Sequence, residues 1–192
     1  MIDLRRLFDI DKTVQVAAYF LKLAGGKMNY LRLLKLLYLA NRESLKENAT
    51  LIIFDRAFAL RNGPILSTVY DLIKGKHTQY SEWHRFIATE DCYVSIANDP
   101  GDDDLSPYEE KVIQSVHDQH CHKTDAEIIE FTHQLMEWRI HESDLNAPRG
   151  KKSYIIDLSD IVASLIQETS NANLLEHVKK KLAGLMFYNS LI

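Results

Sequence analysis

Apolar residues recur at helical spacing over most of the chain, and this pattern predicts a mainly helical fold. We expect Asp11 to cap a first helix over 14–24, which ends at the glycine pair that follows it because glycine adopts the left-handed conformation of a helix end without strain. Asn29 is expected to cap a second helix over 30–48. The leucines of this helix point around most of its circumference, so we expect it to be the central, buried helix.

The segment after this helix has no clean helical period. Residues 51–60 are rich in β-branched and aromatic residues, which favours an extended or irregular segment. Gly63 and Pro64 are expected to open a third helix, because glycine tolerates a sharp turn and a proline at the first helical position has no amide hydrogen that needs a partner. The core-facing positions of that helix recur at helical spacing before Gly75 terminates it: Ile65, Val69, Leu72 and Ile73.

The rest of the chain predicts one hairpin and further helices. Alternation over 85–97 with a polar turn at Glu90 and Asp91 indicates a small β-hairpin. Two Ser/Thr-x-x-Glu capping boxes, which begin at Ser106 and Thr124, predict the starts of two consecutive helices, the second of which runs to Trp138. A loop over 144–152 and helices over 159–168 and 173–188 complete the predicted elements.

These elements predict a mainly α, single helical domain of 192 residues around a central Leu-rich helix, with a small β-hairpin that brings it to the margin of the α+β class. No internal repeat or low-complexity segment divides the chain. Residues 151–192 form a C-terminal helical extension whose role the sequence leaves open.

Charge is distributed unevenly although the net charge is only -4. Residues 1–46 contain nine Lys and Arg against four Asp and Glu, whereas residues 90–145 contain three against fifteen. The acidic block would repel nucleic acid and attract a basic partner, or it is a solvated surface that keeps the protein in solution.

The chain lacks the marks of an exported or membrane protein. Charges interrupt the apolar positions of the N-terminus, and no apolar run is long enough for a signal peptide or a membrane span, so we expect a cytoplasmic protein without membrane contact. Cys92 and Cys121 are expected to be free thiols in a reducing compartment.

One cluster of metal-binding residue types occurs. The cluster His117, His120, Cys121 and His122, with a more distant His133, could supply nitrogen and sulfur ligands to zinc. No HExxH or CxxC motif anchors the set, and the alternative is that these histidines only complement the dipole of a helix end. Nucleophile, phosphate-loop and dinucleotide motifs are also missing, so we expect no enzyme activity, no metal and no cofactor.

A basic face in the first part of the chain has to be weighed as a nucleic-acid site, and its residues would be Lys22, Lys27, Arg32, Lys35 and Arg42. The acidic middle and the leucine-dense helix argue against a reader of nucleic acid. An adaptor or DNA-associated transcriptional regulator remains the alternative function.

Three motifs, in order along the chain, together resemble one known family. The first is a Leu/Lys-rich helix with Leu34, Lys35, Leu36, Leu37, Tyr38 and Ala40. The second is the stretch with Ala59, Gly63, Pro64, Ile65, Val69 and Tyr70, and the third has Thr132, His133 and Trp138. This set is similar to the signature of the Panacea antitoxin family, also described as SocA-like or phage-associated, over residues 14–142. Leu60 stands where the family often has tryptophan, and Ile65 replaces the commoner valine.

The resemblance implies an antitoxin that neutralises a cognate toxin by direct protein-protein binding, without catalysis. We expect Gly63 and Pro64 to fix a tight turn that presents Arg56, Arg61, Asn62 and Tyr70 together at one edge as partner-binding residues. Lys35, Tyr38, His133 and Trp138 rank lower as contact residues. Arg56 and Arg61 could instead pair with acidic residues of the same fold, and His133 and Trp138 could instead belong to the core. The toxin, homo-oligomerisation and the role of the C-terminal extension stay open.

Overall fold

The structure is a computed structural model that describes residues 4–169, 173, 176–177 and 180. The predicted helix over 173–188 therefore lies almost entirely outside the described residues. The helices of the structure are a 3-10 turn at Leu4–Leu7, α1 (Ile10–Leu23), α2 (Tyr30–Asn48), α3 (Ser67–Ile73), α4 (Tyr80–Phe86), α5 (Pro107–His120), α6 (Asp125–His133), α7 (Met136–Arg139), α8 (Glu142–Asn146) and α9 (Leu158–Thr169). The strands are β1 (Lys27–Asn29), β2 (Ala57–Leu60), β3 (Gly63–Leu66), β4 (Ile87–Glu90), β5 (Tyr93–Ile96) and β6 (Ser153–Ile156).

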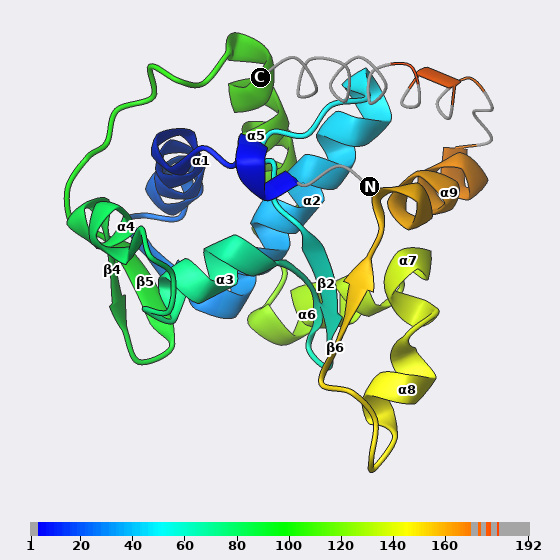
Figure 1. The fold of residues 1–192 in the computed structure, drawn as a ribbon. Helices are drawn as coiled ribbons and strands as arrows, with labels where there is room; N and C mark the ends of the chain where they lie inside the picture. The colour runs from blue at the N-terminus through cyan, green and yellow to red at the C-terminus, as the bar shows by residue number, and fades with distance from the viewer. Residues whose placement is uncertain (1–3, 170–172, 174–175, 178–179, 181–192) are drawn as a thin grey trace.

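Helix α2 packs against helices α1, α3, α5, α6 and α9 and against strands β1 and β3 (Figure 1). It begins as the sequence predicts, because the Asn29 side chain accepts a hydrogen bond from the Leu31 amide at 2.8 Å. Twelve of its nineteen residues are buried, among them the polar side chains of Lys35, Asn41 and Arg42. Since polar groups inside a fold need partners, these three side chains organise the elements around α2.

Helix α1 starts earlier than the sequence analysis expected. Asp9, not Asp11, is its N-cap and accepts from the Lys12 amide at 3.1 Å. The additional turn is helical because Ile10, Thr13 and Val14 are buried against the rest of the fold. The helix ends before Gly25, which has a φ of +81° as expected for a helix end.

The expectation that Gly63 and Pro64 open a helix is wrong, since both lie in β3. Strands β2 and β3 form an antiparallel hairpin in which Leu60 pairs with Gly63 and Ala59 with Pro64. Proline is accommodated because β3 is an edge strand of the sheet, which has the order β3-β2-β6. The third helix instead begins at Ser67.

Buried polar side chains fix the two segments that flank this hairpin, one before β2 and one after β3. The Asn41 amide donates to the Ile53 carbonyl at 2.7 Å and accepts from the Ile52 and Ile53 amides. The Asp55 carboxylate accepts from the Thr68 amide at 2.7 Å and from the Val69 amide, so it caps α3 from a distance in sequence. Burial raises the pKa of Asp55, although its hydrogen bonds oppose the rise.

Strand β6 is absent from the sequence expectation. It pairs antiparallel with β2, with Ala57 opposite Ile156 and Leu60 opposite Ser153. Helix α9 follows it and packs on α2 and α7. The described part of the C-terminal extension thus adds a strand to the sheet and a helix to the core.

The second sheet contains the predicted hairpin, now β4 and β5, with a turn at Asp91 and Cys92. Strand β1, which the sequence analysis missed, pairs with β5 and gives the order β1-β5-β4. Both capping boxes are confirmed, with the Ser106 and Thr124 side chains accepting from the amides three residues later.

The helix predicted to run to Trp138 breaks between α6 and α7. Leu135 has an extended backbone, with φ -67° and ψ 126°, and redirects the chain toward the β2–β3 hairpin. Among the described residues, no helix is long and apolar enough to cross a membrane.

Candidate functional site

The three separated sequence motifs meet at the turn of the β2–β3 hairpin. From α2, Lys35 Nζ donates to the Pro64 carbonyl at 2.8 Å. From α7, Trp138 Nε1 donates to the Leu60 carbonyl at 2.8 Å. The His133 ring stacks on the Trp138 ring with centroids 4.0 Å apart and planes 8° from parallel. The hairpin turn is therefore held from two sides by side chains that the motifs supply.

Gly63 is required at this turn by both its backbone and its surroundings. Its φ is +94°, a conformation that side-chain-bearing residues rarely adopt. A Cβ atom there would lie 2.6 Å from Thr132 Oγ1 and 2.9 Å from Lys35 Nζ. Glycine thus lets the hairpin approach α2 and α6 closely.

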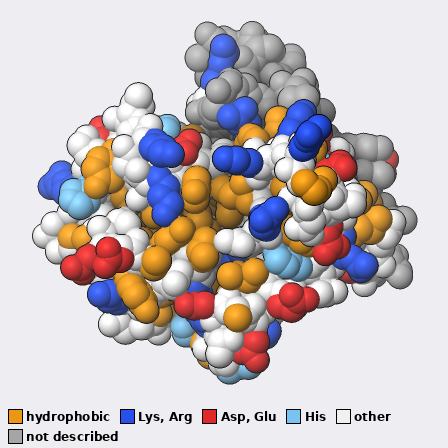
Figure 2. Space-filling model, turned by 90° about the horizontal axis from the view of Figure 1, so that it is seen from below, with side chains coloured by type: hydrophobic (Ala, Val, Ile, Leu, Met, Phe, Trp, Pro, Cys, Tyr) orange, Lys and Arg blue, Asp and Glu red, His pale blue; other side chains and the backbone are white. Residues whose placement is uncertain are grey.

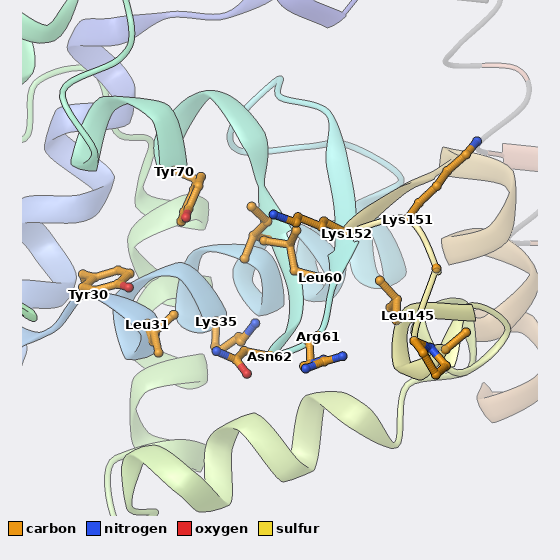
Figure 3. Close-up of a pocket in the computed structure, with 15 residues that line it drawn as sticks. Tyr30, Leu31, Lys35, Leu60, Arg61, Asn62, Tyr70, Leu145, Lys151 and Lys152 are labelled. Atoms are coloured by element: carbon orange, nitrogen blue, oxygen red, sulfur yellow. The ribbon is translucent and has the colours of Figure 1, made fainter. Parts of the chain in front are cut away.

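A cavity of about 470 Å³ opens beside this turn (Figure 3). Five of the predicted site residues line it: Lys35, Arg61, Asn62, Gly63 and Tyr70. Figure 3 shows Tyr30 and Tyr70 near one end and Lys151 at the other, with Lys35, Asn62 and Arg61 between them. Arg61 and Asn62 are exposed at the hairpin turn, and Tyr70 is half-buried.

Arg56 does not join this group. It precedes β2, whereas Arg61 follows it, so the two arginines lie at opposite ends of one strand. The Arg56 guanidinium carbon lies 5.5 Å from the centre of the Phe58 ring. The expectation that Arg56, Arg61, Asn62 and Tyr70 lie together thus holds for the last three alone.

Lys151 and Lys152 line the same cavity and were not among the predicted site residues. They come from the loop before β6, and the pairing of Leu60 with Ser153 brings that loop to the same end of the sheet as Arg61. The adjacent lysines after Gly150 were a visible signal in the sequence, but their place follows only from the unpredicted strand.

Most of the other predicted contact residues are buried supports. Pro64 is buried in β3, and Trp138 is buried where it holds Leu60. His133 is half-buried, and burial first, then the charge of Lys35, lowers the pKa of its imidazole. These residues shape the exposed turn rather than cover it.

Tyr38 belongs to a buried polar network that joins α2, α7 and α9. Its hydroxyl donates to Glu137 Oε1 at 2.9 Å, and Arg42 Nε donates to the same oxygen at 2.8 Å. Arg42 also donates to Ser164 Oγ at 3.1 Å and to Glu168 Oε1 at 2.6 Å. Burial and the Glu137 carboxylate raise the pKa of Tyr38 well above its usual range, so the phenol stays a proton donor.

The Lys35 side chain is fully buried, and its amine donates to the backbone carbonyl of Pro64. Burial lowers the pKa of Lys35 to about 7. In the unfolded chain the same amine keeps its proton to about pH 10.5. Between these two values the unfolded state binds more protons, so rising pH stabilises the fold.

This linkage predicts a pH dependence that Lys35→Met should remove. The unfolding free energy of wild type minus that of the variant should increase from pH 7 to pH 9 by an amount approaching ~1.4 kcal/mol per pH unit, because other titrating groups cancel in the difference. Urea unfolding of both proteins at intervals of pH measures it. Parallel stability curves would show that the Lys35 amine titrates normally in the fold.

The residues considered as zinc ligands do not converge. The His120 ring packs on Phe131, His133 packs on Trp138, and His117 contacts Asp118. Across the described ranges, no group of three or more His, Cys, Asp or Glu side chains could hold a metal ion.

The residues considered as a basic face are not presented as one surface. Lys35 and Arg42 are buried. Arg32 donates to the His120 and Lys123 carbonyls, where it closes the end of α5, and Lys22 pairs with Asp99 at 2.8 Å. Burial and internal pairing thus take up most of the cations proposed to contact nucleic acid.

The chain matches one family model, described as "Antitoxin SocA-like, Panacea domain", over residues 33–139. No curated protein and no solved structure matches the chain. The matched segment runs from α2 to α7 and contains the hairpin, the residues that hold it and most of the predicted site. Because the match covers more than half of the chain, the protein belongs to the SocA-like antitoxin family with a Panacea domain.

Proposed function

We propose that this protein is the antitoxin of a toxin-antitoxin pair and neutralises its cognate toxin by binding it directly, without a catalytic step or a cofactor. Membership of an antitoxin family supports a toxin as the partner. The observation that carries the proposed mode of action is the convergence of the three motifs on one hairpin, which leaves Arg61 and Asn62 exposed beside a cavity.

The hairpin is well suited to binding because it is fixed in advance. Lys35 and Trp138 hold the backbone carbonyls on either side of the turn. A partner that binds Arg61 and Asn62 therefore does not have to order the loop that carries them, which preserves affinity. Arginine and tyrosine are enriched among the residues that dominate binding energy, and Arg61 and Tyr70 supply both types here.

The face seen in Figure 2 has the mixed character of a protein-binding surface. Hydrophobic side chains reach the surface between Lys and Arg side chains, and acidic side chains lie on the same face. Large hydrophobic side chains that are exposed include Met136 and Ile140 at α7 and Ile155 on β6. Such a mixture favours a protein partner over a polyanion, which would need a uniformly basic surface.

Substituting the exposed residues tests the proposal. Arg61→Ala or Tyr70→Ala should weaken toxin binding by about tenfold or more, a loss typical of residues that dominate an interface. Each variant should keep its unfolding free energy within about 1 kcal/mol of wild type. The measurements are growth rescue on co-expression with the product of the neighbouring gene, the affinity of the purified pair and urea unfolding.

Matched controls exist on the same chain. Arg85 is an exposed arginine on α4, and Tyr93 is an exposed tyrosine on β5, and neither lines the cavity. Arg85→Ala and Tyr93→Ala should neutralise the toxin like wild type. If wild type itself neither binds the neighbouring product nor relieves its toxicity, the antitoxin proposal is wrong. If the control variants lose as much affinity as the site variants, binding uses another surface.

A further inference from the structure

The cavity beside the hairpin turn carries positive charge without compensation. Lys35, Arg61, Lys151 and Lys152 line it, and no Asp or Glu does. None of these four cations forms an ion pair with a described residue. By contrast, the largely buried cations Arg32 and Arg42 both have carboxylate partners.

Lys35 contributes a charge to the cavity only in its protonated form. Burial lowers its pKa to about 7, so the amine is partly protonated at neutral pH, and a bound anion would favour the protonated form. Lys151 and Lys152 are exposed on the loop before β6, and Arg61 is exposed at the hairpin turn. An anionic group in the cavity would be attracted by Arg61, Lys151 and Lys152, and by Lys35 when it is protonated.

The walls between these charges are apolar and aromatic. Leu31, Leu60 and Ile65 line the cavity together with Tyr30 and Tyr70. Lys74 Nζ lies 3.7 Å from the centre of the Tyr30 ring, so this ring already carries a cation on its face. The cavity volume of about 470 Å³ falls within the range of sites that enclose a ligand.

We propose that this cavity binds an acidic segment of the toxin, with carboxylate side chains directed at Arg61, Lys151 and Lys152 and apolar side chains packed on the leucine and tyrosine wall. The inference rests on the proposed function for the identity of the partner. The chemistry of the cavity itself, cations in a concave apolar pocket, fits an acidic peptide. A nucleic acid would require cations spaced along an extended groove.

The first experiment uses a probe that does not depend on the toxin. An end-blocked hexapeptide of glutamate and its glutamine counterpart are titrated into the full-length protein and followed by backbone amide shifts and by calorimetry. The glutamate peptide should bind and shift the amides of Arg61, Asn62, Lys151 and Lys152, whereas the glutamine peptide should not. Equal binding of both peptides, or shifts confined to other surfaces, would overturn the inference whether or not the toxin binds.

The second experiment compares charge-matched variants. Lys151→Ser/Lys152→Ser should lower the affinity for the glutamate peptide and for the toxin by about tenfold, the sum expected for two exposed charge pairs at low salt. Lys76→Ser/Lys111→Ser removes the same charge from exposed positions outside the cavity and should have little effect. The salt dependence of toxin affinity should also become shallower in the first variant alone.

The outcomes separate the two proposals. If wild type binds the toxin and the Lys151→Ser/Lys152→Ser variant binds it equally well with the same salt dependence, the cavity inference fails while the antitoxin proposal stands. If the glutamate peptide binds in the cavity but the neighbouring product is not bound, the acidic-peptide site stands with another partner and the antitoxin proposal fails. If a single-stranded DNA oligonucleotide binds the cavity more tightly than the glutamate peptide, the site serves nucleic acid and the inference is wrong.

Discussion

Replacing Gly63 with alanine should destabilise the fold by about 2–5 kcal/mol, the combined scale of a strained backbone and an overpacked core. The new Cβ would meet Thr132 Oγ1 at 2.6 Å and Lys35 Nζ at 2.9 Å. Neither neighbour can withdraw freely, because Thr132 donates to the Ile129 carbonyl and Lys35 to the Pro64 carbonyl. The substitution should also disturb the exposed turn, so toxin neutralisation should fall with stability.

Gly25→Ala is the matched control for this prediction. Gly25 has a similar positive φ of +81°, but a Cβ there would have nothing within 4 Å. Gly25→Ala should therefore lower the free energy of unfolding by only about 1–2 kcal/mol, from backbone strain alone. Urea unfolding of both variants isolates the steric part as their difference. Equal losses would mean that the close approach of Gly63 to Thr132 and Lys35 does not matter.

Glu137→Leu should be the most damaging single change in the buried network, with an expected loss of about 3–5 kcal/mol. It would leave the Arg42 guanidinium and the Tyr38 hydroxyl without the carboxylate that both now donate to. The Arg42 cation would keep its desolvation penalty with only the partly exposed Glu168 carboxylate left to offset it. Thermal and urea unfolding measure the loss, and toxin affinity at a temperature where the variant is folded should change little.

Two further variants make this prediction specific. Glu43→Gln breaks the half-buried pair with Lys46, a pair between neighbouring turns of one helix, and should cost less than about 1 kcal/mol. The triple variant Tyr38→Phe/Arg42→Met/Glu137→Leu removes all the donors as well and should recover much of the loss, since an apolar replacement of a buried ion pair is often neutral. If the triple variant is less stable than Glu137→Leu alone, the network stabilises the fold more than hydrophobic packing could.

Local signals in the sequence predicted the parts of the fold that depend on neighbouring residues. The caps at Asn29, Ser106 and Thr124 bond to amides two or three residues away, so their patterns are readable in one short window. The β4–β5 hairpin is equally local. By contrast, β6 pairs with β2, a strand about a hundred residues earlier in the chain. The short sequence of residues 153–156 gives no indication of which strand it will pair with.

The candidate site shows the same division. Residues of the three motifs lie close together around the hairpin, but the sequence could not separate those that are exposed there from those that are buried beneath it. Lys35 and Trp138 are buried and hold the turn, while Arg61 and Asn62 are exposed on it. Gly63 was expected to begin a helix, but the structure places it in a hairpin. The sequence could not distinguish the two, because glycine's tolerance of unusual backbone conformations suits a helix start and a tight hairpin equally well.

Strand β6 also has a consequence for how the molecule is made. A nascent chain released only as far as residue 139 would contain the whole family-matched segment, yet β2 would lack one neighbour and Arg42 would lack Ser164 and Glu168. Contacts across such a separation form late, after the intervening chain has been ordered. Binding competence should therefore depend on residues beyond the family-matched segment, and a fragment that ends at residue 139 should be a poor substitute for one that includes β6 and α9.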